Sequence, residues 1–376
     1  MDNNKSHKYF LGDKNFSHEF KPAVGILIVN LGTPDDPTPS GVKNFLREFL
    51  NDPRIIEVPK ILWKTLLYTF ILNTRPKKVS KLYTKIWTKE GSPLLTISKS
   101  TVDKLREQLL LQFGTPLHVE LGMRYGNPSI AEGLKKLKEK NCHRVIFLPL
   151  FGQYSSTTVG AALDALFDEL KKWRWVPEIR TINQFHDTKE YISSIANNIR
   201  RHWEKHGKGD KLLLSFHGMP KRYVLAGDPY HCHCYKTARL IAEELEIPKD
   251  KYQVTFQSQF GKEEWIKPAT DKTLEDWAKM GLKSVDVVCP GFIADCLETL
   301  EEIEVENKEI FLSNGGEKFH YIPAVNDGAE FINCLVSLIK ENSGAWLDSL
   351  DEWNQAEYMK EAGLVKERYE KLLENS

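Results

Sequence analysis

Short runs of consecutive apolar residues recur along the chain, and longer segments of helical period separate them. An uninterrupted run of this kind is typical of a strand that is buried on both faces of a parallel sheet. The runs that we interpret as strands are residues 24–29, 118–123, 144–150, 179–183, 212–216, 253–257, 285–289 and 320–322.

The segments between these runs have apolar positions spaced for one face of a helix. The predicted helices are residues 40–50, 98–112, 129–138, 160–172, 189–206, 236–245, 271–279, 295–306 and 327–341. Because strands and helices alternate, right-handed crossovers would place helices on both faces of parallel sheets. We therefore predict an α/β fold with two Rossmann-like domains, each a four-stranded parallel sheet flanked by helices, with an active site in the cleft between them. The predicted boundaries are 22–186 and 187–341 for the two domains and 342–376 for a C-terminal helical extension.

The segment 54–75 is unusually apolar for a connection between helices. Its apolar residues are Ile61, Leu62, Trp63, Leu66, Leu67, Tyr68, Phe70, Ile71 and Leu72. Because they cover more than one stripe of a helix, part of the segment would face a greasy ligand or a membrane surface. A core helix with lysines on its surface is the alternative.

The composition excludes several classes of function. The 376 residues carry 52 basic and 52 acidic side chains, so no basic excess points to nucleic acid. The polar N-terminus lacks the apolar core of a signal peptide, and no apolar run is long enough to span a bilayer, so we expect a cytoplasmic protein. Its six cysteines are too sparse for a secreted disulfide scaffold and should be reduced. A G-x-G-x-x-G motif after a strand and a G-x-x-x-x-G-K-[ST] motif are both missing, which disfavours nucleotide binding.

A row of carboxylates follows the strand 285–289. If a helix begins near Asp295, then Glu298, Glu302 and Glu306 lie on one face, where like charges repel by roughly 0.2–0.5 kcal/mol per neighbouring pair. A bound cation would offset that repulsion. Alternatively, Asp295 is an N-cap, Glu298 is its partner in a capping box, and the later glutamates form a solvated face.

His217 ends the predicted strand 212–216, where α/β sheets present functional groups. A lone histidine is more often a satisfied structural residue. His217 and Glu298, however, belong to the same predicted half, so both should project into one cleft. An imidazole with carboxylates and no thiolate set suits a labile divalent metal such as Fe²⁺ or Zn²⁺.

The sequence His231-Cys-His-Cys234 is a second candidate metal site. Ligands one residue apart, with no second pair nearby, do not match a structural zinc module. We therefore predict that Cys232 and Cys234 are dispensable thiols.

Aromatic and basic residues follow three other strands, at residues 124–125, 151–158 and 257–265. Flat apolar walls with a few cations fit a planar ligand that carries carboxylates. Ordinary loop and core aromatics would look similar in sequence.

The segments that carry these residues resemble the ferrochelatase family, whose members catalyse the terminal step of haem synthesis. The resemblance runs in a consistent order from about residue 23 to 339. The matching segments are ILIVNLGTP from Ile26, GSP from Gly91, MRYGNP from Met123, QYS from Gln153, SFHGMP from Ser215, GDPY from Gly227, FQSQFG from Phe256 and CPGFIADCLETLEE from Cys289.

The resemblance implies insertion of Fe²⁺ into protoporphyrin IX in a cleft between two chelatase-type domains, with release of two protons. His217 and Glu298 match the family's catalytic and metal-site residues, and the segment 54–75 resembles an apolar lip over the porphyrin mouth. Glu302 and Glu306 would pass protons or metal along the helix face. The implied substrate-binding positions are Arg124, Tyr125, Tyr154, Gln257 and Trp265.

The sequence departs from the family pattern at two places, and each departure changes what we expect of the protein. Ser156 stands where animal members have a cluster-binding cysteine, and residues 348–376 contain no cysteine, so we expect no iron–sulfur cluster and no cofactor beyond the substrate iron. Cys296 stands where some members have a second histidine, which puts a proton-relay role there in doubt. The alternatives are a chelatase for another metal or tetrapyrrole, such as cobalt or coproporphyrin, and a non-catalytic bilobed binder of metal or haem.

Overall fold

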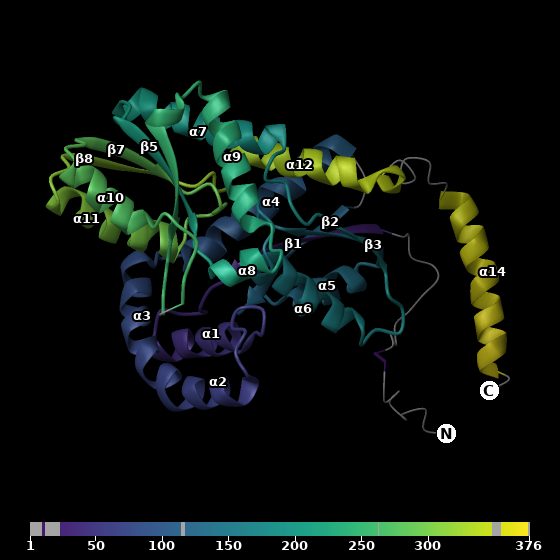
Figure 1. The fold of residues 1–376 in the computed structure, drawn as a ribbon. Helices are drawn as coiled ribbons and strands as arrows, with labels where there is room; N and C mark the ends of the chain where they lie inside the picture. Colours follow the sequence, from purple (N-terminus) through teal and green to yellow (C-terminus); the bar gives the residue numbers. More distant parts are fainter. Residues whose placement is uncertain (1–9, 12–22, 114–116, 262, 348–354, 375–376) are drawn as a thin grey trace.

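The computed structural model describes residues 10–11, 23–113, 117–261, 263–347 and 355–374, with the side chains of Gln355 and Leu373 left aside. Its described strands form two parallel sheets, as predicted (Figure 1). The first has the order β2-β1-β3-β4 and the second β6-β5-β7-β8. Their bounds are Ala23–Gly32 (β1), Leu117–Tyr125 (β2), Cys142–Pro149 (β3), Glu178–Thr181 (β4), Lys211–His217 (β5), Tyr252–Gln257 (β6), Ser284–Val288 (β7) and Lys318–Ile322 (β8).

The strand order places a switch point in each sheet. From β1 the chain goes outward to β2 and then returns to the other side at β3, and β5, β6 and β7 repeat this pattern. Loops at the carboxyl ends of strands diverge at such points and leave a crevice. The topology therefore predicts binding beyond the ends of β1 and β3 in one half and of β5 and β7 in the other.

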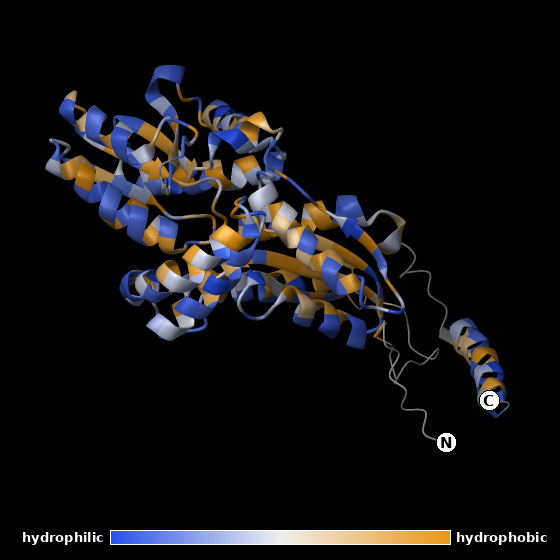
Figure 2. Ribbon diagram, turned by 60° about the horizontal axis from the view of Figure 1, so that its bottom comes forward, coloured by the Kyte–Doolittle hydropathy of each residue, from blue (hydrophilic) through white to orange (hydrophobic). Residues whose placement is uncertain are grey.

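Helices cover both sheets, and one apolar core continues from the first half into the second. Side chains of both sheets, such as Ile26, Ile146 and Leu214, belong to one buried cluster. Figure 2 shows hydrophobic strands beneath helices that are hydrophilic on their outer faces. The covering helices are α4 (Pro93–Phe113), α5 (Ile130–Glu139), α6 (Ala161–Leu170), α7 (Lys189–His206), α9 (Tyr230–Glu244), α10 (Thr270–Lys279) and α12 (Ala329–Ser343). Because the core is continuous, the division near residue 186 stays a prediction.

The segment 54–75 belongs to a longer helical arm that extends beyond its predicted end. After α1 (Pro39–Asn51), the arm consists of α2 (Lys60–Leu66), the π-helix η1 (Leu67–Ile71) and α3 (Leu72–Ile86). Leu67 and Leu72 are buried, whereas Ile61, Leu62 and Phe70 are 83%, 69% and 61% exposed. Part of the segment therefore faces outward, and its contact with a ligand or a membrane surface stays a prediction.

Two helix predictions need correction. The helix expected at 295–306 begins at 298 as a π-helix, η4 (Glu298–Asn307), and continues as α11 (Lys308–Ser313). Helix α9 begins at Tyr230 rather than 236, because Gly227 and Pro229 end the preceding turn. The remaining short helices are η2 (Ser156–Gly160), α8 (Lys221–Leu225) and η3 (Lys249–Lys251). In the predicted extension, α14 (Gln355–Glu374) stands apart from the sheets in Figure 1, and residues 348–354 lie outside the described part.

Candidate active site

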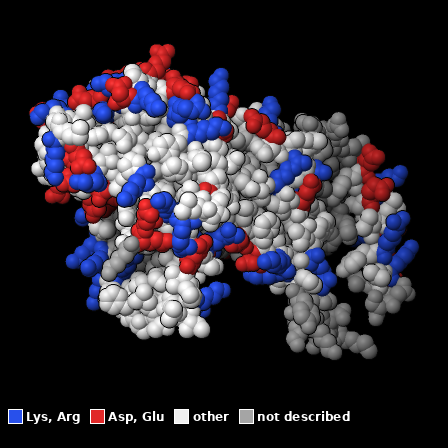
Figure 3. Space-filling model, viewed as in Figure 1, with Lys and Arg blue, Asp and Glu red and all other residues white. Residues whose placement is uncertain are grey.

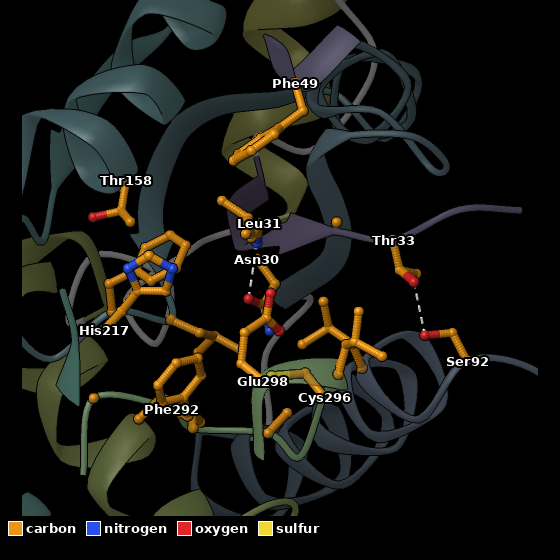
Figure 4. A pocket seen from close by; sticks show the side chains of 18 of the residues that line it. Asn30, Leu31, Thr33, Phe49, Ser92, Thr158, His217, Phe292, Cys296 and Glu298 are labelled. Atoms are coloured by element: carbon orange, nitrogen blue, oxygen red, sulfur yellow. Dashed lines mark hydrogen bonds between the residues drawn. The ribbon is translucent and has the colours of Figure 1, made fainter. Parts of the chain in front are cut away.

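A cavity of about 260 Å³ lies where the two switch points face each other. The end of β1 contributes Asn30, the loop after it contributes Thr33, and the loop after β3 contributes Gln153. The second half contributes His217 from β5 and Glu298 from η4. Most of the remaining lining is apolar, which makes the cavity suitable for a greasy ligand held by a few polar groups. As expected, His217 and Glu298 face the same cavity (Figure 4).

The His217 imidazole has a defined tautomer. Its Nδ1 lies 2.6 Å from the carbonyl oxygen of Gly218. A carbonyl can only accept, so the neutral ring carries its proton on Nδ1 and keeps a lone pair on Nε2. The turn that holds the ring is tightly packed, since a Cβ on Gly218 would lie 2.8 Å from the Gln257 carbonyl oxygen and 3.0 Å from Trp265. Trp265 is buried and supports this turn from behind, outside the cavity lining.

Asp295 anchors the start of η4 but makes no capping box with Glu298. Its Oδ1 accepts from Thr299 Oγ1 (3.0 Å) and from the Tyr321 hydroxyl (2.5 Å), and its backbone N–H donates to Asn326 Oδ1 (2.8 Å). The N–H that a capping-box glutamate would accept is therefore already taken. This frees the Glu298 carboxylate to face the cavity.

Glu302 lies one turn behind Glu298 in a polar cluster at the end of β6. Its carboxylate accepts from the N–H of Ser258 (2.6 Å) and from Ser258 Oγ (2.5 Å). Burial raises the pKa of Glu302, and the charge of Glu298 adds to that shift, while the bonds from Ser258 and the nearby His217 oppose it. Glu306, another turn along, is exposed.

Gln257 ties this cluster to the sheet. Its Nε2 donates to the Glu298 carbonyl oxygen (2.9 Å) and to Glu302 Oε2 (3.3 Å), and its Oε1 accepts from Ser215 Oγ (2.8 Å). With both ends engaged and the side chain buried, Gln257 is placed to hold η4 rather than to line the cavity.

The opposite wall is aromatic, and its charges lie behind it. Phe45 and Phe49 of α1 line the cavity. Tyr125 packs edge-on against Phe49, with ring centroids 5.1 Å apart, and is 1% exposed. The Tyr125 hydroxyl donates to Asp52 Oδ2 (2.8 Å), and Arg124 forms an ion pair with the same carboxylate. Arg124 and Tyr125 are thus absent from the cavity lining, and their role as substrate contacts stays a prediction.

Helix α3 closes one side of the cavity and is tied to η4. Val79 and Tyr83 line the cavity, and no residue of 54–75 takes part in the lining. The part of the arm that lines the cavity therefore lies after the predicted segment. Lys85 forms an ion pair with the buried carboxylate of Glu301. This contact links the arm that bears the exposed apolar residues to the helix that bears Glu298.

The segment that contains Tyr154 is held from α9. Tyr154 donates its N–H to His233 Nδ1 (3.2 Å), and Gln153 Nε2 donates to Thr237 Oγ1 (2.9 Å). Asp228 accepts from the N–H of Ser156 (2.7 Å). Gln153 lines the cavity and Tyr154 does not, so α9 positions the lining loop through the backbone of its neighbours.

All six cysteines are free thiols. In α9, Cys232 is exposed whereas Cys234 is buried, because residues two apart point away from each other on a helix. Among the described residues, no group of three or more His, Cys, Asp or Glu side chains is arranged to hold a metal. Cys296 lines the cavity, and burial, together with the charge of Glu298, raises its pKa well above the ordinary value, so this thiol keeps its proton.

Sequence reasoning missed several lining residues on the first half. Asn30 is buried and donates to Ser98 Oγ (3.1 Å), and the hydroxyls of Thr33 and Ser92 lie 2.8 Å apart (Figure 4). The apolar pattern breaks after residue 29, near the end of β1 at Gly32, and this break was a usable signal. No sequence pattern marked Ser92 as a lining residue, because its approach to Thr33 depends on how α4 packs.

Comparisons with known proteins show the family and the fold. A family model described as Ferrochelatase matches residues 23–343. A ferrochelatase of Nitrosococcus oceani is 47% identical over 90% of this chain and 92% of its own length. One of Hydrogenovibrio crunogenus is 49% identical over 88% and 89%. The sirohydrochlorin chelatase SirB of Bacillus subtilis subspecies spizizenii, solved with cobalt, shares the fold at 10% identity, with a TM-score of 0.51 over 86% of this chain and 96% of that chain.

Proposed function

The chain belongs to the ferrochelatase family, and we propose that His217 and Glu298 carry out the exchange of porphyrin protons for iron in the cavity between its sheets. The activity itself is insertion of Fe²⁺ into protoporphyrin to form protohaem, the last step of haem synthesis. The observation that carries the assignment of residues is the placement of an imidazole and a carboxylate in one largely apolar cavity.

The two residues have different tasks. Metalation replaces two pyrrole N–H protons by one Fe²⁺, so a base must accept protons while a ligand guides the metal. The Nε2 lone pair of His217 can take a pyrrole proton, because its Nδ1 proton is held by the carbonyl oxygen of Gly218. Glu298 offers a carboxylate that can bind Fe²⁺ or carry a proton.

Glu302 and Glu306 extend this pair toward solvent. Burial raises the pKa of both carboxyls, which favours taking up a proton. Glu302 is half-buried and Glu306 exposed, so a proton or metal ion could move along η4 between cavity and solvent. Cys296 holds its proton too firmly to serve as such a carrier.

The helical arm supports a membrane-surface contact. Its residues Ile61, Leu62 and Phe70 are exposed, and Figure 3 shows an uncharged surface in the region of α2. Residues 58–89 contain eight Lys or Arg and no Asp or Glu. Apolar groups beside cations suit the surface of an anionic bilayer.

No described helix has the length and hydropathy of a membrane span. We infer a cytoplasmic protein that touches the inner face of the cell membrane and needs no cofactor or iron–sulfur cluster.

The activity is tested by mixing purified protein, protoporphyrin IX and Fe²⁺ without oxygen. Protoporphyrin fluorescence should decay at a rate that saturates with porphyrin, and the product should show the absorption of protohaem. A parallel reaction with coproporphyrin measures preference. Stoichiometric porphyrin binding without fluorescence loss would identify a binding protein instead.

A further inference from the structure

Two stacked histidines lie behind the loop that carries Gln153 and Tyr154. The imidazole of His233, in the first turn of α9, packs face to face on that of His186, with ring centroids 3.8 Å apart and an interplanar angle of 9°. His186 lies between β4 and α7 and is buried. Neither ring belongs to the cavity lining, yet hydrogen bonds connect both residues to the loop that does.

The bond from Tyr154 fixes the protonation state of His233. The N–H of Tyr154 donates to His233 Nδ1 (3.2 Å). Because an N–H group can only donate, Nδ1 must hold a lone pair, and the neutral ring carries its proton on Nε2. A protonated imidazole has an N–H at both ring nitrogens and cannot accept this bond. The contact between α9 and the loop therefore exists only while His233 is neutral.

A second chain of hydrogen bonds joins the histidine stack to the cavity. The carbonyl oxygen of His186 accepts from Thr237 Oγ1 (2.7 Å), and Thr237 Oγ1 accepts in turn from Gln153 Nε2 (2.9 Å). Gln153 and Thr237 are buried, so these bonds are shielded from water. Gln153 thus reaches the cavity from a loop that α9 holds at two points, through a side chain at Gln153 and through the backbone at Tyr154.

The charges around His233 come from three segments: Asp187 follows β4, Asp228 precedes α9, and Lys236 lies one turn along α9. Burial lowers the pKa of His233 and Lys236 lowers it further, while the two carboxylates raise it. Both carboxylates have other partners, since Asp187 pairs with Lys236 and Asp228 accepts from the N–H of Ser156 (2.7 Å). The bond from the loop is therefore complete at neutral pH and is lost as pH falls below the ordinary histidine pKa of about 6.5.

We propose that His233 is a positioning residue for metalation: its neutral imidazole holds the loop that presents Gln153 to the porphyrin, and protonation of the ring releases this loop. The proposal rests on the proposed function of the cavity. His233 lies outside the cavity lining, so it acts through the loop and not on the reacting atoms. Its loss should weaken porphyrin binding more than turnover, because His217 and Glu298 stay in place on β5 and η4.

The test compares two replacements of His233. The amide oxygen of His233→Gln can still accept from the Tyr154 N–H, whereas His233→Leu offers no acceptor. At pH 7.5, His233→Leu should raise KM for protoporphyrin about threefold or more and leave kcat within about twofold, and His233→Gln should restore a near-native KM.

A pH series then tests the release of the loop. Between pH 7.5 and pH 5.0, porphyrin affinity measured without metal should fall about threefold more in native protein than in His233→Gln, because an amide does not titrate. The ratio of the two proteins cancels the ionisation of the porphyrin and of His217, which both share. His231→Gln is the matched control, since His231 is a half-buried histidine of the same helix whose ring packs on Tyr235 and Phe256. It should keep the native KM and the native pH dependence.

Hydrogen exchange at the Tyr154 amide gives a result that does not depend on activity. Exchange should be about tenfold faster in His233→Leu than in native protein or His233→Gln, with circular dichroism as the check of folding. Equal exchange and equal KM in native protein and His233→Leu would overturn the proposal while leaving metalation itself established. Failure of native protein to metalate porphyrin would contradict the proposed function instead, and equal exchange in native protein and His233→Leu would still show that His233 does not hold the loop.

Discussion

The two walls of the cavity present different kinds of side chains to a ligand. The wall from β5 and η4 exposes an imidazole and a carboxylate to the cavity, with Gln257 and Glu302 hydrogen-bonded behind them. The wall from α1 exposes Phe45 and Phe49, and keeps its charges behind the rings, on Asp52. One wall can therefore change protonation during a reaction, whereas the other offers a flat apolar surface that a porphyrin ring can lie against.

This difference predicts that changes on the first-half wall act on stability, whereas changes of His217 and Glu298 on the second-half wall act on rate. The largest effect on stability should come from Asp52→Asn. That change leaves Arg124 in a partly buried site without its carboxylate, and breaking a buried ion pair typically costs about 3–5 kcal/mol. Thermal unfolding measures the loss. The control is Asp164→Asn, whose ion pair with Arg54 is well exposed and should contribute under about 1 kcal/mol. Equal losses in the two variants would contradict this account of the wall.

A second effect concerns the arm that continues the first-half wall. Serine at Ile61, Leu62 and Phe70 should lower binding to anionic vesicles at least tenfold, because each exposed side chain is free to enter a bilayer surface. The melting temperature should shift by no more than a few degrees. Leu67→Ser, at a fully buried position in the same arm, should instead destabilise the fold. Unchanged vesicle binding in the triple variant would contradict the proposed membrane contact.

The smallest effect is the pH dependence attached to Glu302. Burial raises the pKa of its carboxyl in the folded state. Stability from this group is therefore complete below the unfolded value, ~4.3, and is lost as pH rises through the raised pKa. Glu302→Gln cannot ionise, so its melting temperature should exceed that of the native protein near pH 7, and the gap should close toward pH 4. Melting curves from pH 4 to 8 test this, with Glu309→Gln, at an exposed position of α11, as the control. A difference in melting temperature that does not change with pH would show that protonation of Glu302 is not coupled to folding.

Much of this architecture could be predicted from the sequence. All eight strands lie where apolar runs predicted them. Strands such as β1 and β5 are buried on both faces and so leave an uninterrupted pattern. His217 and Glu298 could be placed together because each follows a strand of the same half, and parallel strands end at one edge. The resemblance to a known family then supplied the chemistry that the pattern alone left open.

What could not be predicted depends on long-range packing. Arg124 and Tyr125 lie at the carboxyl end of β2, where pocket residues are expected. Both nevertheless bond to Asp52, more than 70 positions earlier, and so lie behind the wall. The π-helical form of η4 leaves no periodic signal that separates it from an α-helix. The Lys85–Glu301 contact joins residues 216 positions apart, so local pattern carries no information about it.

The central claim is that His217 and Glu298 act together in one step, and their turnover numbers test it most directly. His217→Ala and Glu298→Gln should each lower kcat about 10²-fold or more, which corresponds to about 2.7 kcal/mol, with porphyrin affinity little changed. The double variant should lose much less than the product of the two single losses, because the residues serve the same step. His118→Gln and Glu309→Gln, which lie outside the cavity, should retain native turnover. A His217→Ala or Glu298→Gln enzyme with near-native kcat would contradict the account.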